Sequence, residues 1–413
     1  MNNPGFADLG LADPILRALD AREHTTPTPI QEKAIPELLG DMDLLGIAQT
    51  GTGKTGAFAL PILHTLSRAH VDGKRRHPRA LVLAPTRELA IQIGEEFHGY
   101  GKFLHLRHVV IFGGVSQHPQ VNKLRRGVDI LVATPGRLLD LMEQGHINLG
   151  YIEHLVLDEA DRMLDMGFIR DVRKIIAKLP EDRQSLLFSA TMPGEVAKLS
   201  QDILYEPVRI DIAPKAVAVE VIKQSVHFVD TNEKIGLLRD LLADKQMKRV
   251  IVFTRTKHRA NRVADALTKA DIQADVIHGN KSQGARQRAL DAFRSGSARV
   301  LVATDIAARG IDVSGITHVV NFELPNDPES YVHRIGRTAR AGADGAALSF
   351  CDPSEYDQLK DIEKLIRQTI TVAGGERPTQ VVRMKPSGRG GRNRPGRNRN
   401  RSRRNRRPSR RAA

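Results

Sequence analysis

The stretch that decides the fold begins at residue 44 and reads Leu44-Leu45-Gly46-Ile47-Ala48-Gln49-Thr50-Gly51-Thr52-Gly53-Lys54-Thr55. Its first five residues have the length and composition of a buried strand, and a helical pattern follows Thr55. A glycine-rich turn between a strand and a helix lets backbone N–H groups approach phosphate oxygens. The stretch therefore predicts a phosphate loop, and its predicted nucleotide contacts are Thr50, Gly51, Thr52, Gly53, Lys54 and Thr55.

An acidic pair follows another apolar run, in Leu155-Val156-Leu157-Asp158-Glu159. Because parallel strands end at one edge of a sheet, this pair should lie near Lys54 and Thr55. Lys54 is the expected partner of the β and γ phosphates, Thr55 and Asp158 are predicted Mg²⁺ ligands, and Glu159 is predicted to polarise the attacking water. Alone, a pair of acids is also compatible with a solvated turn. A phosphate loop alone leaves a kinase, a GTPase and a helicase open.

The alternation of strand and helix extends through most of the chain. Apolar runs, each followed by polar residues and a helical pattern, predict an α/β fold with doubly wound parallel sheets. The runs are 44–48, 80–84, 130–133, 154–157 and 185–188, then 249–253, 274–277, 299–303, 317–321 and 345–350. Residues 130–134 and 300–304 read Ile-Leu-Val-Ala-Thr and Val-Leu-Val-Ala-Thr, which hints at two related domains.

Positive charge is concentrated at the C-terminal end. Residues 383–413 contain 14 Lys or Arg and no Asp or Glu, so residues 1–382 carry about +1 of the net charge of +15. Between Pro386 and Arg411 there is no aromatic or aliphatic residue that could offset the entropy of ordering. We expect a disordered tail that binds nucleic acid through its charge. A solubilising appendage is the alternative.

Composition narrows the class of protein. With 40% hydrophobic and 27% charged residues in a chain of 413, an ordinary globular protein of two or three domains is expected. No apolar run has the length of a membrane span and the start, Met1-Asn2-Asn3-Pro4, lacks the features of a signal peptide, so a cytoplasmic protein without membrane contact is predicted. The single cysteine, Cys351, excludes an intrachain disulfide.

Further motifs carry a resemblance to a known family. Asp158-Glu159-Ala160-Asp161 is the tetrapeptide after which the DEAD-box helicases are named. It occurs with Pro85-Thr86-Arg87-Glu88-Leu89-Ala90, Gly113-Gly114, Thr134-Pro135-Gly136-Arg137, Ser189-Ala190-Thr191, Val252-Phe253-Thr254, Ala303-Thr304-Asp305, Arg309-Gly310-Ile311-Asp312 and His333-Arg334-Ile335-Gly336-Arg337-Thr338-Ala339-Arg340. Over residues 6–370 the chain thus resembles a DEAD-box ATP-dependent RNA helicase. Its sequence around Gln31 and at residues 278–283 is similar to that of the bacterial RhlE type.

The resemblance implies a domain plan. It consists of two RecA-like doubly wound parallel-sheet domains in tandem, with a disordered basic C-terminal tail. The expected boundaries are 1–211 for the ATP-binding domain with its N-terminal Q motif, 212–219 for a linker, 220–370 for the second domain and 371–413 for the tail.

The resemblance also implies roles in nucleotide chemistry. Phe6 would stack on the base, Gln31 would read the adenine edge, and Asp312 would contact the ribose, so ATP is expected. Arg337 and Arg340 resemble arginine fingers, which come from the second domain to a γ phosphate held by the first. With Lys54, Asp158 and Glu159 they complete the predicted catalytic set. The positions that resemble residues coupling hydrolysis to RNA are Asp161, Ser189, Thr191 and His333.

Contacts to RNA follow from the same resemblance. Small residues, hydroxyls and Arg suit phosphate and 2′-OH contacts that do not read sequence. The implied positions are Pro85, Thr86, Arg87, Gly113, Gly114, Thr134, Pro135, Gly136, Arg137, Thr254 and Thr304.

The expected function is RNA-stimulated ATP hydrolysis with local unwinding of short duplexes by a monomer, acting on single-stranded or short duplex RNA, with ribosomal or RNA-decay proteins as possible partners. A non-catalytic RNA chaperone or ATP-gated clamp and a DNA translocase are the alternatives.

Overall fold

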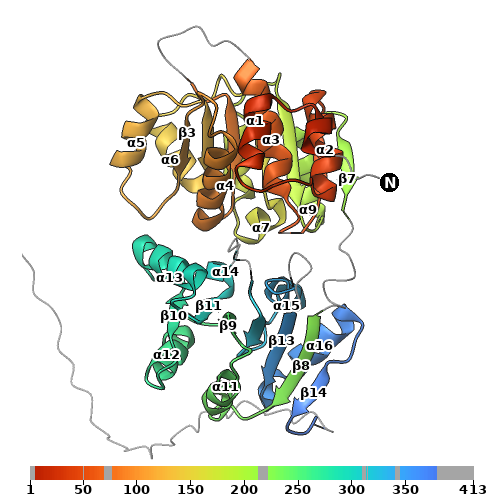
Figure 1. The fold of residues 1–413 in the computed structure, drawn as a ribbon, viewed down its shortest axis with the longest axis vertical. Helices are drawn as coiled ribbons and strands as arrows, with labels where there is room; N and C mark the ends of the chain where they lie inside the picture. Colours follow the sequence, from red (N-terminus) through yellow and green to blue (C-terminus); the bar gives the residue numbers. More distant parts are fainter. Residues whose placement is uncertain are drawn as a thin grey trace, which may run out of the picture. The chain divides into compact units, whose positions relative to one another are not determined.

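Two parallel β-sheets, one in each half of the chain, carry the helices of this protein (Figure 1). The computed structural model describes residues 5–49, 51–68, 77–212, 222–308, 313, 315–339 and 345–378. Nearly all of the predicted linker and of the basic tail lies outside these residues. Among the described helices, none combines the length and the apolar composition that a membrane crossing requires.

The first sheet has seven strands within the described residues, all parallel to their neighbours. The central strands are mostly apolar runs because both faces of the sheet are covered there and no polar face is needed. In spatial order they are β3 (His108–Ile111), β4 (Ile130–Ala133), β2 (Ala80–Leu83), β5 (His154–Leu157), β6 (Gln184–Ser189), β1 (Leu44–Ile47) and β7 (Val208–Asp211).

Helices pack on both faces of this sheet because successive strand residues point to opposite sides. Val82 joins the core of one face, and Leu81 and Leu83 join that of the other. The first face carries η1 (Phe6–Leu9), α1 (Asp13–Asp20), α2 (Pro29–Leu39), α3 (Lys54–Arg68) and α4 (Arg87–Tyr100). The second carries α5 (His118–Arg125), α6 (Pro135–Glu143), α7 (Ala160–Asp165), α8 (Ile169–Ile176) and α9 (Gly194–Ile203).

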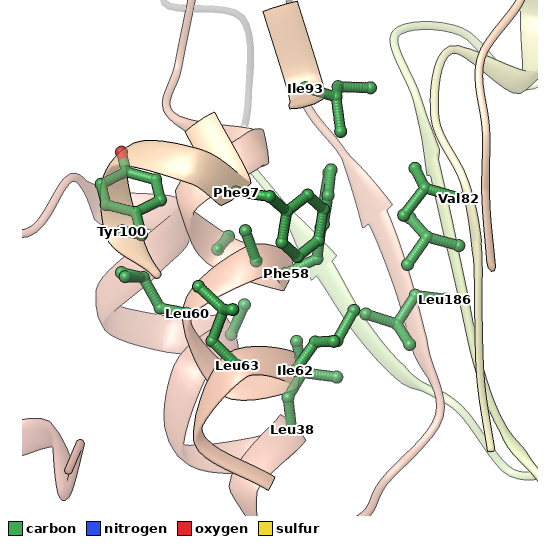
Figure 2. Packing of buried hydrophobic residues seen from close by; sticks show 14 of the residues in the cluster. Leu38, Phe58, Leu60, Ile62, Leu63, Val82, Ile93, Phe97, Tyr100 and Leu186 are labelled. Atoms are coloured by element: carbon green, nitrogen blue, oxygen red, sulfur yellow. The ribbon is translucent and has the colours of Figure 1, made fainter. Parts of the chain in front are cut away.

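Helix α3 is fixed by an aromatic cluster in the first core (Figure 2). Phe58 has no exposed surface, and its ring centroid lies 6.3 Å from that of Phe97 on α4 and 5.6 Å from that of Phe188 on β6. Burying a side chain of this size contributes about 2–3 kcal/mol relative to leaving it exposed. The N-terminus of α3, where Lys54 lies, is therefore attached to a rigid base.

The second sheet also has seven parallel strands in the part of the chain that is described. Helices α11 and α12 cover one face, and α13 to α16 cover the other. The strands, in order, are β10 (Ala274–Ile277), β11 (Val300–Thr304), β9 (Val250–Thr254), β12 (His318–Asn321), β13 (Gly345–Cys351), β8 (Ile222–Phe228) and β14 (Thr371–Gly374). The helices are α11 (Lys234–Leu242), α12 (Lys257–Thr268), α13 (Gln283–Ser295), α14 (Asp305–Ala308), α15 (Pro328–Ile335), η2 (Pro353–Glu355) and α16 (Tyr356–Ile366).

The two sheets have the same strand order. Numbered from its own first strand, each runs 3-4-2-5-6-1-7. The repeated pentapeptides at 130–134 and 300–304 supply β4 and β11, which hold the same position in the two orders. The hint of two related domains is thereby confirmed.

Each of the ten predicted strands coincides with an observed strand to within one residue at either end. Four strands were missed: β3, β7, β8 and β14. They carry exposed or half-buried residues and so lack the continuous apolar run on which the prediction relied. Strand β14 lies beyond residue 370, so the second sheet continues past the predicted end of its domain.

Candidate nucleotide and RNA site

The strand order of the first sheet groups the predicted nucleotide residues. Strands β5, β6 and β1 are neighbours, and their carboxyl ends lead into Asp158, Ser189 and the phosphate loop. Loops after the carboxyl ends of parallel strands form the ligand edge of such a sheet. The structure thus brings together residues that are more than a hundred positions apart in sequence.

The phosphate loop has the backbone that its glycines allow. Gly51 and Gly53 have φ values of +85° and +91°, a region that residues with a Cβ rarely adopt. A Cβ at Gly53 would lie 2.6 Å from Thr28 Oγ1 and 2.8 Å from Gln31 Nε2. Thr50 lies outside the described residues.

Gln31 links helix α2 to the phosphate loop. Its Nε2 donates to the carbonyl of Gly53 at 3.0 Å, and its Oε1 accepts from the backbone N–H of Thr28 at 2.9 Å. Gln31 is buried, with 6% of its surface exposed. It therefore supports the conformation of the loop, in addition to the predicted role at the adenine edge.

A cavity of about 710 Å³ opens beside the loop. Phe6, Gln31, Lys54 and Thr55 line one part of it, together with Asp158 and Glu159. Its lining also includes Arg22, His24, Glu96 and Tyr100, with the Arg22 guanidinium 4.6 Å from the centre of the Tyr100 ring and 2.9 Å from Glu96 Oε1. A volume of this size suits a nucleotide.

Lys54 and Asp158 face each other at the bottom of the cavity. Their Nζ and Oδ1 atoms are 3.7 Å apart, both side chains are buried, and neither atom has a hydrogen-bond partner among the described residues. Burial, opposed by Lys54 and reinforced by the adjacent Glu159, raises the pKa of Asp158 to about 6. Buried polar atoms without partners are costly, so these two are suited to a ligand that supplies the missing contacts.

These residues fit a nucleotide-bound Mg²⁺ ion. Such an ion takes one or two protein oxygens and several from phosphates and water, and a carboxylate and a hydroxyl are available at Asp158 and Thr55. The described residues contain no group of three or more His, Cys, Asp or Glu side chains arranged to hold a metal alone.

Glu159 has an unusual backbone and a buried charged neighbour. It precedes α7 with φ 56° and ψ 54°, in the left-handed region. Its Oε2 accepts from Arg162 Nη1 at 3.0 Å, and the two side chains are 3% and 4% exposed. The sequence interpretation gave Arg162 no role, although its position three residues after Glu159 in a helical segment was a usable signal.

Asp161 connects α7 to the end of β6. Its Oδ2 accepts from the backbone N–H of Thr191 at 3.0 Å, from the Thr191 hydroxyl at 3.1 Å and from the N–H of Ala190 at 3.2 Å. The Ser189 hydroxyl accepts from the N–H of Asp161 at 3.2 Å and donates to the carbonyl of Thr191 at 2.7 Å. The predicted coupling residues Asp161, Ser189 and Thr191 thus form one network.

The predicted RNA residues of the first domain follow a second group of neighbouring strands. Pro85, Thr86 and Arg87 come after β2, Gly113 and Gly114 after β3, and the segment 134–137 after β4. These strands are adjacent in the order β3-β4-β2, so the three loops meet at one part of the edge. The loops with nucleotide residues occupy the other part.

These loops also contact one another. A Cβ on Gly114, whose φ is +73°, would lie 2.3 Å from Arg87 Nη1, so Arg87 passes directly over this glycine. Arg137 Nη2 donates to the carbonyl of Val115 at 3.1 Å, and Arg137 Nε lies 3.3 Å from Asp140 Oδ2. The Thr86 hydroxyl accepts from the N–H of Leu89 and so caps α4. Pro85, Thr134 and Pro135 are buried, whereas Gly114 and Gly136 are exposed.

In the second domain, Arg334 fixes the end of α15, the helix that precedes Arg337. Its Nε and Nη2 bind Asp305 at 2.5 and 2.7 Å, and its Nη1 donates to the Glu323 carbonyl at 2.7 Å. Arg334 is 2% exposed, and Arg337, two residues after the end of α15, is 4% exposed. Both arginines and His333 border one small cavity. Arg334 was quoted within a motif but was not predicted as a site residue.

The other predicted site residues of the second domain differ in burial, and two of them lie outside the described residues. Thr254 is fully buried and its hydroxyl donates to the carbonyl of Thr256 at 3.3 Å, so RNA would need its backbone or a rearrangement. Thr304 is half-buried at the end of β11. Asp312 and Arg340 lie outside the described residues.

Comparison with known proteins identifies the family. The model for DEAD/DEAH box helicases matches residues 28–199, and that for the helicase conserved C-terminal domain matches residues 233–342. The chain is 44% identical, over 365 residues, to the DEAD-box ATP-dependent RNA helicase CshA of Bacillus cereus, with 88% of this chain and 69% of the relative covered. The chain belongs to the DEAD-box family of ATP-dependent RNA helicases.

Other relatives and solved structures agree with this assignment. CshA of Limosilactobacillus reuteri is 43% identical, with 88% of this chain and 72% of the relative covered. S. cerevisiae Dbp5 bound to RNA and ADP BeF3 is similar with a TM-score of 0.77 and 34% identity, covering 90% of this chain and 95% of that one. Mss116p bound to ssRNA and AMP-PNP gives a TM-score of 0.81 at 29% identity, covering 92% and 81%. The two sheets of this DEAD-box protein are accordingly RecA-like domains.

Proposed function

We propose that this helicase hydrolyses ATP with the triphosphate held against residues 51–55 and the attacking water polarised by Glu159. The observation that carries the proposal is the buried ion pair of Lys54 Nζ and Asp158 Oδ1, which are 3.7 Å apart and have no hydrogen-bond partner among the described residues. A γ phosphate would accept the hydrogen bonds that Lys54 Nζ does not make, and these would contribute to binding. Phe6 and Gln31 lie on the same cavity, where an adenine would be bound.

Thr55 and Asp158 are the proposed protein ligands of Mg²⁺. When bound, the ion supplies positive charge that offsets the charge of the triphosphate. Asp158 would hold it in ionised form, because a bound cation favours the ionised carboxylate and so opposes the rise in pKa that burial causes. Lys54 and Thr55 meanwhile orient the phosphates from the N-terminus of α3.

The second domain is proposed to complete the site with Arg337 and Arg340, to contact the ribose through Asp312 and to relay hydrolysis through His333. The burial of Arg337, and the contacts by which Arg334 ties the end of the preceding helix to Asp305 and Glu323, support a fixed direction for the Arg337 side chain. If ATP and RNA each bind both domains, each stabilises the closed form, and their affinities are reciprocally coupled.

RNA is proposed to bind through its backbone along the loops after β2, β3 and β4. These loops offer glycines, hydroxyls and two arginines, which suit phosphates and 2′-OH groups without base recognition. We propose that closure bends a single strand and locally melts a short duplex. Sequence-independent remodelling of short duplexes or ribonucleoproteins follows.

Some finer assignments also remain proposals. They are the RhlE type, although the relatives compared above carry the name CshA, a monomeric state, a cytoplasmic location, and ribosomal or RNA-decay proteins as partners. The alternative function, an ATP-gated clamp without turnover, predicts RNA binding that does not depend on hydrolysis.

The deciding experiment compares the full chain with Glu159→Gln. The wild type is expected to show RNA-stimulated ATPase activity and displacement of a short RNA duplex. The variant should keep its affinity for ATP and RNA and lose at least about 100-fold in kcat, since a positioned proton acceptor contributes 10²–10⁴-fold. Equal ATPase rates with and without RNA would contradict the proposal, and strand displacement by Glu159→Gln at the wild-type rate would favour the clamp.

A further inference from the structure

Arg162 is a buried cation between two acidic residues of the proposed site. Its Nη1 donates to Glu159 Oε2 at 3.0 Å, and its backbone N–H donates to Asp161 Oδ1 at 3.0 Å. With 4% of its side chain exposed it is almost completely removed from water. One residue therefore contacts both the proposed water-polarising group and the network that leads to Thr191.

The geometry restricts what the Glu159 side chain can do. A left-handed backbone conformation just before α7 fixes the point from which the side chain starts, and such conformations persist only where the surroundings enforce them. A buried carboxylate requires a partner, and Asp158 next to it carries the same charge. The hydrogen bond to Arg162 fixes the rotation of the Glu159 carboxylate.

We propose that Arg162 is a positioning residue for ATP hydrolysis, which aims the Glu159 carboxylate at the attacking water. The inference rests on the proposed role of Glu159 and goes beyond it by naming the group that sets its direction. Arg162 acts through Glu159 rather than on the substrate. Its loss should therefore slow the hydrolytic step and leave the binding of ATP and RNA unchanged.

Helix α7 has supports that do not depend on the Arg162 side chain. Ala160 and Met163 are 0% and 1% exposed and belong to the second core of the first domain. Asp161 is held by three hydrogen bonds from Ala190 and Thr191. A variant at Arg162 should thus keep the helix and the coupling network.

The test uses Arg162→Met, Arg162→Lys and the control Arg173→Met in the full chain. Arg173 lies on α8 of the same domain, where its Nη1 pairs with Asp202 at 2.6 Å in an exposed position. For Arg162→Met we expect RNA-saturated kcat to fall by about 10–100-fold, because a misdirected catalytic group costs up to about 10² in rate. The KM for ATP and the RNA affinity in AMP-PNP should stay within about twofold of wild type.

Partial recovery of kcat in Arg162→Lys, which keeps the charge, and no change in Arg173→Met would support positioning. The proposal is overturned if kcat of Arg162→Met stays within about twofold of wild type. It is equally overturned if kcat, ATP affinity and RNA affinity fall together with the melting temperature, or if ATPase activity without RNA rises, which would make Arg162 a brake.

A double-mutant comparison covers the case in which Arg162→Met folds poorly. In the Glu159→Gln background, Arg162→Lys should cause no further loss of kcat, because residues that act as one unit are not additive. An additive loss would refute positioning through Glu159. If Glu159→Gln alone leaves kcat unchanged, the proposed role of Glu159 fails. If Glu159→Gln lowers kcat but the Arg162 variants do not, the role of Glu159 stands and the positioning role of Arg162 fails.

Discussion

Gln31 is the residue where an N-terminal helix meets the phosphate loop. Both ends of its side-chain amide are bound to backbone groups, one at Thr28 and one at Gly53. A buried amide held at both ends has one orientation available, so the Gly53 carbonyl to which it binds is also restrained. The affinity for nucleotide should therefore depend on Gln31 even before any contact with the base.

Gln31→Leu is expected to weaken binding of a fluorescent ATP analogue by about tenfold, since each lost hydrogen bond costs about 1 kcal/mol. Gln120→Leu is the matched control. Gln120 is likewise buried, and its amide exchanges two hydrogen bonds with the backbone of Phe112, away from the nucleotide cavity. Titrations without RNA should show wild-type affinity for the control, and an equal loss in both variants would point to general destabilisation.

For single residues, sequence motifs predict the site residues that belong to a motif. They do not predict residues whose role depends on partners that the fold brings close. Gly53 and Lys54 could be identified because glycine, lysine and hydroxyl chemistry at that spacing is specific. Arg162 and Arg334 could not be assigned in the same way. Their partners are Glu159, whose side-chain direction depends on a left-handed backbone, and Asp305, which lies 29 positions from Arg334 in the sequence.

A buried ion cluster joins α11 to the end of β13 in the second domain. Lys234 is 1% exposed and pairs with Glu355 and, at 3.2 Å, with Asp352. Arg255 Nη2 also lies 2.9 Å from Glu355 Oε1. Glu355 further accepts from the backbone N–H of Leu324 at 3.1 Å. The cluster thus ties three elements together through Lys234 and Glu355, which are buried, and through Arg255, which is partly exposed.

Lys234→Met should destabilise the second domain by about 3–5 kcal/mol, because removing one partner leaves buried carboxylates uncompensated. Lys245→Met is the control, since Lys245 is exposed and such changes stay within about 0.5 kcal/mol. Hydrogen exchange of amides in α11 and β13 is the measurement. Faster exchange in the first domain of Lys234→Met would show that the effect is not local.

The same cluster predicts a dependence of stability on pH. Although burial opposes it, the hydrogen bond from Ser354 and the charge of Lys234 lower the pKa of Asp352 to about 2. A lowered carboxyl pKa contributes stability above the ordinary value of about 4, and this contribution is lost as pH falls toward 2. Asp352→Asn should therefore be less stable than wild type at pH 6, and this difference should shrink toward zero near pH 2. If urea titrations show the same difference in unfolding free energy between wild type and Asp352→Asn at every pH, stability is not linked to the ionisation of Asp352.

Among the elements, burial on both faces decided which strands could be predicted. The central strands β2, β4 and β5 read as unbroken apolar runs. Strand β8 alternates between buried and exposed residues, and β14 is exposed along most of its length at the edge of the sheet. An alternation of apolar and polar residues over only four to seven positions is hard to distinguish from the amphipathic pattern of the many helices in this chain. Such strands are recruited by pairing, here with β13 and β8.

At the level of the whole molecule, the repeated strand order allows the candidate residues of the two sheets to be compared strand by strand. In the first sheet the group β5-β6-β1 precedes the nucleotide residues and the group β3-β4-β2 precedes the RNA residues. In the second sheet the equivalent of β4 is β11, which ends at Thr304, and that of β2 is β9, which ends at Thr254. The candidate RNA residues of the second domain thus end strands that are equivalent to two of the strands preceding the candidate RNA residues of the first domain.

The positive charge of the chain is concentrated in its C-terminal tail and not in the two domains that hold the candidate site. Residues 383–413 carry 14 cations and no acid, while the preceding residues are nearly neutral overall. Binding of arginines to phosphates releases counterions and is therefore steeply dependent on salt. A tethered cationic segment also raises the local concentration of RNA near the domains. We expect the tail to set affinity for RNA and the domains to set the response to ATP.

Deleting residues 386–413 should weaken RNA binding and flatten its salt dependence, while the RNA-saturated kcat stays near wild type. For single strands, each neutralised phosphate contributes about 0.7 to the slope of log K against log salt, so a loss of three contacts would reduce the slope by about 2. A full-length variant with the tail arginines changed to lysine keeps the charge and should keep the slope. Fluorescence anisotropy between 50 and 300 mM salt, roughly the range over which counterion release changes affinity most visibly, gives both slopes. An unchanged slope after deletion would mean that the cations of the tail do not contact RNA, and that the two domains bind it unaided.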